Sequence, residues 1–159
     1  MEKPLLPPEP VTNQAVADRL ISDVTRNIQE GLIKKRNLVY LELNGCSGNI
    51  ISLLNGQNPD FSFMVLSMVN LLYSNSLMGA EGEQAIGKLM NALDEDYILA
   101  VEGAVSLKNN GFYNVIGRWQ GAPLTGLQAA TMLGEKASHI LAVGACATHG
   151  GVSAAKPNP

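Results

Sequence analysis

Apolar residues recur at helical spacing near the start of the chain and gather into short continuous runs further on. Residues 1–12 hold four of the eight prolines, which predicts an irregular arm. After the arm, a stripe of apolar positions three and four residues apart predicts one amphipathic N-terminal helix over residues 13–37. The stripe consists of Val16, Leu20, Ile21, Val24, Ile28 and Leu32.

The apolar runs alternate with segments of helical periodicity. Compact runs rich in strand formers predict buried strands over residues 38–43, 97–101 and 139–143. Helices are predicted over residues 50–54, 83–93 and 124–136, with a loop at 109–111. Residues 60–73 are apolar almost throughout, and the length of this run favours a helix. The alternation predicts an α/β fold with a parallel sheet flanked by helices.

Three loops follow the predicted strands, and function collects beyond the carboxyl ends of strands in open α/β sheets. The loops cover residues 44–49, 102–104 and 144–151. Cys46 lies in the first loop and Cys146 in the third. If the strands are parallel, these two cysteines meet at one edge of the sheet. The glycines beside each cysteine allow the backbone to approach a bulky group, as a metal-sulfur cluster requires.

Composition and charge exclude several classes of protein. The 159 residues, 46% apolar and 16% charged, fit one globular domain. A net charge of −3 excludes the positive field of a nucleic-acid binder. No apolar run approaches the roughly 20 residues of a membrane span, and the first residues lack an export leader, so a cytoplasmic protein is expected.

Two cysteines cannot form a disulfide framework or an all-cysteine four-ligand site, which leaves an incomplete metal site or two inert thiols.

Five sequence blocks resemble the small, electron-transferring subunit of nickel-iron hydrogenases over residues 38–159, in the order of that family. The blocks are Gly45-Cys46-Ser47-Gly48 with Ser52-Leu53-Leu54, Gly82-Glu83-Gln84-Ala85, Val101-Glu102-Gly103-Ala104-Val105, Val143-Gly144-Ala145-Cys146-Ala147-Thr148, and Gly150-Gly151-Val152 through Ala155-Lys156-Pro157-Asn158-Pro159.

The resemblance implies a flavodoxin-like domain over residues 38–159 that carries an iron-sulfur cluster, 4Fe-4S or 3Fe-4S. Cys46 matches the first cluster cysteine and Cys146 the third, while Glu83 is a candidate for a role near the cluster. The chain itself holds no catalytic residue, because the nickel-iron centre belongs to the partner large subunit. The implied function is an electron relay, with further iron-sulfur or flavin subunits as partners.

This chain departs from the family pattern at two ligand positions. The pattern Gly-Cys-x-Gly-Cys has Asn49 at its second cysteine, and the fourth cysteine of the family lies beyond Pro159. Asn49 is either a weak oxygen ligand, which implies a three-iron cluster or an altered potential, or the N-cap of the following helix. Glu83 also suits a helix N-terminus, and Glu102 after a buried strand needs a partner.

Two other functions compete with the relay. The first is a non-catalytic interaction or sensory module that keeps the fold with a degenerate cluster site, as Asn49 suggests. The second is a flavin-binding flavodoxin, which is weaker because a phosphate loop needs several hydroxyl residues and the first loop offers only Ser47.

Overall fold

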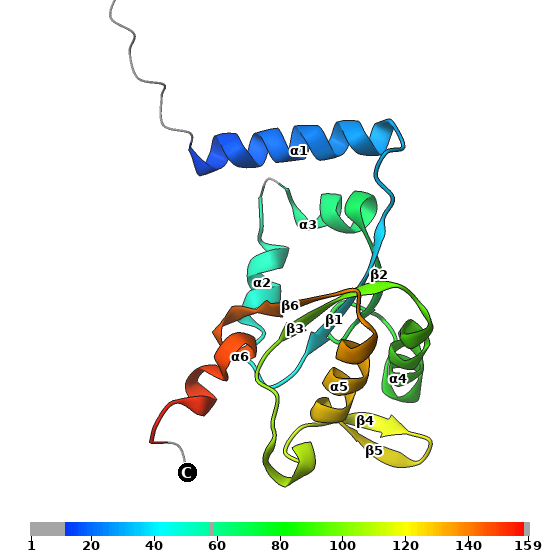
Figure 1. Ribbon diagram of the computed structural model, residues 1–159, viewed down its shortest axis with the longest axis vertical. Helices are drawn as coiled ribbons and strands as arrows, with labels where there is room; N and C mark the ends of the chain where they lie inside the picture. Colours follow the sequence, from blue (N-terminus) through cyan, green and yellow to red (C-terminus); the bar gives the residue numbers. More distant parts are fainter. Residues whose placement is uncertain (1–11, 58, 158–159) are drawn as a thin grey trace, which may run out of the picture.

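One long helix precedes the sheet. The computed structural model describes residues 12–57 and 59–157, so the predicted irregular arm lies outside the described residues apart from Thr12. The Thr12 hydroxyl accepts a hydrogen bond from the Ala15 amide (3.1 Å) and caps α1 (Asn13–Gln29). The helix ends at Gln29, eight residues before the end of the helix predicted over residues 13–37, because Gly31 has a left-handed backbone (φ +70°). It crosses the end of the body from which the first strand starts (Figure 1).

Four parallel strands form the central sheet in the order β2-β1-β3-β6. Their bounds are β1 (Arg36–Glu42), β2 (Val69–Ser74), β3 (Tyr97–Glu102) and β6 (His139–Val143). The predicted parallel α/β sheet flanked by helices is confirmed. Numbered along the chain, these strands occupy the first four places of the flavodoxin-like order 2-1-3-4-5.

Helices cover the sheet and connect its strands. They are α2 (Gly48–Leu54), α3 (Phe61–Phe63), α4 (Gly82–Asn91), α5 (Gly126–Lys136) and α6 (Gly144–His149). The helices predicted over residues 50–54 and 83–93 are confirmed. Within residues 12–57 and 59–157, no helix combines the length and the apolar character needed to cross a membrane.

The helix predicted over residues 60–73 is wrong in its second half. Asp60 accepts a hydrogen bond from the Phe63 amide (2.6 Å) and starts α3, which continues as a π-helical turn, η1 (Met64–Met68). The chain then becomes β2, which pairs with β1. A strand of a parallel sheet and a buried helix can both have continuously apolar sequences, so the pattern alone could not separate them.

A β-hairpin precedes α5 and was not predicted. It consists of β4 (Val115–Trp119) and β5 (Ala122–Thr125). The helix predicted from residue 124 therefore begins two residues later, because Thr125 ends β5 and forms a capping box with Gln128. The predicted loop at 109–111 lies in a short 3-10 turn, η3 (Lys108–Gly111), with left-handed residues inside it.

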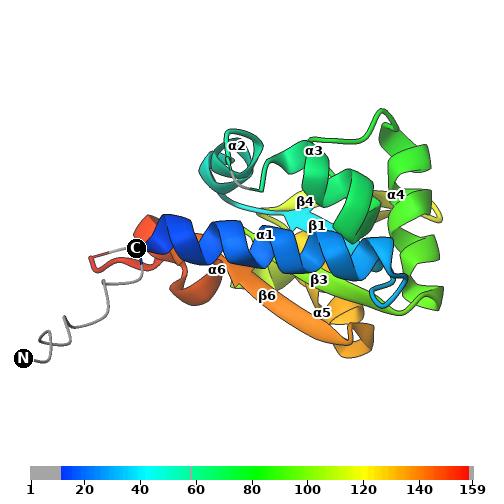
Figure 2. The same ribbon diagram turned by 90° about the horizontal axis from the view of Figure 1, so that it is seen from above.

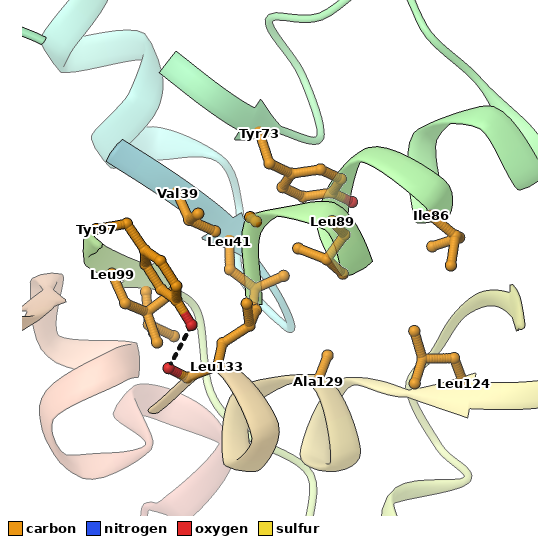
Figure 3. Close-up of a cluster of buried hydrophobic side chains, with 12 residues drawn as sticks. Val39, Leu41, Tyr73, Ile86, Leu89, Tyr97, Leu99, Leu124, Ala129 and Leu133 are labelled. Carbon is orange, nitrogen blue, oxygen red and sulfur yellow. Dashed lines mark hydrogen bonds between the residues drawn. The ribbon is translucent and has the colours of Figure 1, made fainter. Parts of the chain in front are cut away.

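Two apolar clusters hold the helices on the sheet. The larger lies between β1, β3, α4 and α5, and in it the Tyr97 hydroxyl donates to the Leu133 carbonyl (2.8 Å) (Figure 3). The smaller lies beneath α2 and contains Leu38, Tyr40, Ile50 and Ala100. Because Ile50 is buried in this second cluster, the start of α2 is fixed against the strand ends.

Candidate functional site

Three loops meet at the carboxyl edge of the sheet. They follow β1, β3 and β6, which are parallel and adjacent in that order, so the expectation that these loops share one edge is confirmed. The first two loops are also joined by backbone hydrogen bonds between Asn44 and Ala104 (3.2 and 2.8 Å). Gly103 lies between them at φ +90°, and a Cβ there would come within 2.8 Å of the Leu43 and Asn44 carbonyl carbons. Only glycine allows this contact.

The buried side chain of Glu102 links β1 and the start of α2 at this edge of the sheet. It is 2% exposed and ends β3. Its carboxylate accepts hydrogen bonds from the Tyr40 hydroxyl (2.8 Å) and from the Asn49 and Ile50 amides (3.0 Å each). Ser47, which precedes α2, makes no side-chain cap. A buried carboxylate from a neighbouring strand therefore occupies the N-terminus of this helix, where its charge is favoured.

Asn49 joins all three strand ends. Its side-chain nitrogen lies 3.4 Å from Glu102 Oε1 and 3.5 Å from the Val143 carbonyl oxygen, both long hydrogen bonds. Gly144 has φ +81°, and a Cβ there would lie 2.8 Å from Asn49 Oδ1, so the amide packs against bare backbone. The alternative that Asn49 caps its helix is wrong. The N-cap position belongs to Ser47, and Glu102 satisfies the amides instead.

The two cysteines flank this arrangement. Cys46 is exposed before α2, and Cys146 is half-buried in α6. A glycine packs against each sulfur: a Cβ would lie 3.0 Å from Cys46 Sγ at Gly48 and 2.7 Å from Cys146 Sγ at Gly151. In the described ranges, no group of three or more His, Cys, Asp or Glu side chains could hold a metal ion. This part of the chain therefore offers two thiol ligands with open backbone beside them.

Glu83 lies apart from the cysteine loops. It is exposed in the first turn of α4, and it lines a cavity of about 470 Å³ together with Tyr73 and Arg118. In both views, α4 and α6 lie at opposite sides of the molecule (Figures 1 and 2). The predicted role of Glu83 near a cluster stays a prediction.

Sequence reasoning did not single out Tyr40. Burial, followed by the hydrogen bond to Glu102, raises the pKa of Tyr40 well above its ordinary value. The phenol therefore remains protonated and donates to the carboxylate. The available signal was a hydroxyl-bearing side chain among the apolar residues of this strand, since such a group needs a partner when buried.

Comparison with known proteins agrees with these features. The family model described as NADH ubiquinone oxidoreductase, 20 Kd subunit, matches residues 46–159 and so begins at Cys46. The periplasmic NiFe hydrogenase small subunit 1 of Nitratidesulfovibrio vulgaris is 34% identical over 79% of this chain and 39% of its own length. The uptake hydrogenase small subunit of Afipia carboxidovorans is 37% identical over 85% of this chain and 37% of its own length.

The fold is also found in solved hydrogenases. A chain of the NiFeSe hydrogenase from Desulfovibrio vulgaris Hildenborough superposes with a TM-score of 0.76 at 29% identity, over 79% of this chain and 46% of that one. The present chain thus spans less than half of the length of each of these relatives. The resemblance to small subunits of nickel-iron hydrogenases is confirmed, and the chain belongs to the family of the NADH ubiquinone oxidoreductase 20 Kd subunit.

Proposed function

We propose that this chain is an electron-transfer small subunit of a nickel-iron hydrogenase complex. The observation that carries the proposal is the placement of Cys46 and Cys146 on loops that follow β1 and β6, at one edge of a sheet shared with hydrogenase subunits. Hydrogen oxidation takes place on a partner large subunit, and this chain passes the electrons to further iron-sulfur or flavin subunits.

Cys46 and Cys146 fit two of the ligand positions of an iron-sulfur cluster. Thiolates are the usual ligands of such clusters. A glycine lies beside each sulfur, and the missing side chain leaves space next to the thiol. The bound cluster supplies one-electron oxidation and reduction. The Asn49 amide nitrogen is directed at Glu102 and the Val143 carbonyl, which leaves its oxygen as the candidate third ligand, and a further ligand comes from outside the described donor set.

The protein around the cysteines holds them in place. Glu102 fixes the start of α2, two residues after Cys46, and Asn49 links that start to the end of β6, which precedes Cys146. This arrangement keeps two positions that are distant in sequence in a constant relation. Ligands on rigid elements of this kind define a site more precisely than ligands on free loops.

The cytosolic location is a separate part of the proposal. It comes from the sequence alone, whereas the relative from Nitratidesulfovibrio vulgaris is named as a periplasmic protein. Fractionation of cells that produce the tagged chain tests it: recovery in the periplasmic fraction contradicts a cytosolic complex.

Metal analysis of the complex purified without oxygen tests the function. We expect about three or four irons per chain, with matching acid-labile sulfide, and a nickel-bearing partner that copurifies. Iron without a nickel-bearing partner contradicts the hydrogenase assignment. A chain with neither iron nor sulfide is an interaction or sensory module, and bound flavin without iron identifies a flavodoxin.

Replacement of Asn49 by cysteine tests the unusual ligand position. We expect Asn49→Cys to convert a three-iron signal to a four-iron signal, or to lower the midpoint potential, because a thiolate adds negative charge next to the cluster. EPR-monitored redox titration measures both. Asn55→Cys, at the other end of α2, is the matched control and should leave spectrum and midpoint unchanged. If Asn49→Cys behaves like this control, position 49 does not face the cluster.

A further inference from the structure

A cavity beside the start of α4 contains a buried hydroxyl without a partner. The cavity has a volume of about 470 Å³ and lies between the loop that follows β2, the start of α4 and the hairpin strand β4. Tyr73 lines it and is 3% exposed, and its ring extends from β2 toward α4 (Figure 3). The Tyr40 and Tyr97 hydroxyls each donate a hydrogen bond, whereas in the part of the chain that the structure describes the Tyr73 hydroxyl makes none. A buried hydroxyl needs an acceptor, so we expect one in the cavity.

The Tyr73 phenol is available as a donor. Burial, and after it the negative charge of Glu42, raise the pKa of Tyr73 above its ordinary value. The phenol therefore stays protonated and can donate its hydrogen. Glu42 does not take this hydrogen, because its carboxylate accepts from the amide and the hydroxyl of Ser76 instead (3.0 and 2.8 Å). The acceptor for Tyr73 therefore comes from a bound molecule.

Further donors face the same cavity. The side chain of Glu81 does not cap α4, so the first amides of the helix have no acceptor within it. Gly82 has φ +57°, and no atom beyond its own helix and chain neighbours lies within 4 Å of where its Cβ would be, which leaves these amides open to a ligand. Arg118 lines the cavity, donates to the Gly121 carbonyl (3.3 Å) and belongs to neither of the two ion pairs among the described residues. Together with Tyr73, these groups form a donor set that suits a carboxylate.

Two carboxylates also line the cavity. Glu81 and Glu83 are both exposed, and neither takes part in the two ion pairs among the described residues. With Arg118 as the cation, the lining holds one positive and two negative side chains, and this excess of negative charge disfavours a multiply charged phosphate. A molecule with both a carboxylate and an ammonium group matches the donors and the glutamates together.

We propose that this cavity binds a small zwitterion of the α-amino-acid class with an apolar side chain. Its carboxylate accepts from the first amides of α4, from Tyr73 and from Arg118. Its ammonium group faces Glu81 and Glu83. Its side chain contacts the apolar part of the lining, which includes Met78, Ile86 and Ile116. The proposal goes beyond the electron-transfer function.

Equilibrium dialysis of the purified complex against radiolabelled leucine tests the site. We expect saturable binding of one leucine per copy of this chain. Two competitors each lack one charged group of leucine: isocaproate lacks the ammonium group, and isoamylamine lacks the carboxylate. Each should compete at least about tenfold more weakly than unlabelled leucine. The proposal is overturned if leucine shows no saturable binding at millimolar concentration, or if either competitor matches it.

Removal of the buried hydroxyl locates the bound leucine. Tyr73→Phe keeps the ring and should weaken leucine binding about tenfold, because a hydrogen bond to a charged group is lost. Tyr113→Phe is the matched control, since this tyrosine is 66% exposed and lines a different cavity. It should bind leucine as the unaltered chain does. Equal affinities in the two variants overturn the proposal.

A second variant at an exposed position guards against damage to the core. Arg118→Gln lies on the surface of β4 and should also weaken leucine binding about tenfold, and unchanged affinity overturns the proposal. Iron and sulfide content, measured on the same samples, reports on the electron-transfer function separately. Retained iron without leucine binding refutes this inference alone.

Discussion

Replacement of Glu102 by alanine is expected to lower the free energy of unfolding by about 3 kcal/mol. The change removes a buried acceptor and leaves the Tyr40 hydroxyl and the Asn49 and Ile50 amides without their partner. It also removes the negative charge from the N-terminus of α2. Urea denaturation followed by circular dichroism, on the chain with and without bound metal, measures the loss.

Two milder variants separate the contributions to this loss. Tyr40→Phe removes one hydrogen bond and keeps the ring, so it should cost about 1 kcal/mol. Glu102→Gln keeps the shape and one acceptor oxygen but turns an amide group toward donors, and it should fall between the other two. If Glu102→Ala costs no more than Tyr40→Phe, the carboxylate does not hold α2 in place.

Replacement of either cysteine by alanine is expected to remove the bound iron almost completely, from about three or four irons per chain to fewer than one. Each variant leaves a single thiolate of this chain, and the hydroxyls and amides nearby are weak ligands for iron. Iron analysis and EPR of the anaerobically purified complex measure the effect. Electron transfer to an artificial acceptor should fall in parallel.

A neighbouring substitution controls for damage to the loop. Ser47→Ala changes the residue next to Cys46 without altering either sulfur, and it should retain the iron of the unaltered chain. A Cys46→Ala or Cys146→Ala protein with full iron content would show that the thiol concerned is an inert side chain. The cluster ligands would then have to be found on a partner.

The strands of the sheet could be predicted because their sequences are almost continuously apolar, although the strand over residues 139–143, which was predicted to be buried, is largely exposed. Residues 38–43, 97–101 and 139–143 stand between segments of clear helical period, and all three are strands. Residues 60–73 were misread because the same apolar run contains a helical turn and a strand, and pairing with β1 decides where one ends. The hairpin β4–β5 has no comparable apolar signal, because Gly117 and Arg118 interrupt β4 and Pro123 stands inside β5.

The site was predictable only as far as topology determines it. Parallel strands bring Cys46 and Cys146 to one edge, and that expectation needed no side-chain detail. The partners of Glu102 could not be predicted, because Tyr40 lies 62 residues away and the two meet through the pairing of β1 with β3. Asn49 could not be assigned either, because its partners Glu102 and Val143 stand at the ends of two other strands.

The backbone bridge between Asn44 and Ala104 has a consequence for the proposed electron transfer. It extends the pairing of β1 and β3 beyond the strands, so backbone hydrogen bonds join the loop that carries Cys46 to the loop that follows Glu102. The backbone dipoles of these two loops are held in fixed orientations, so they need not reorient when the charge of a bound redox group changes by one electron. For the proposed cluster we therefore expect a small reorganisation energy, which favours rapid transfer over the same distance.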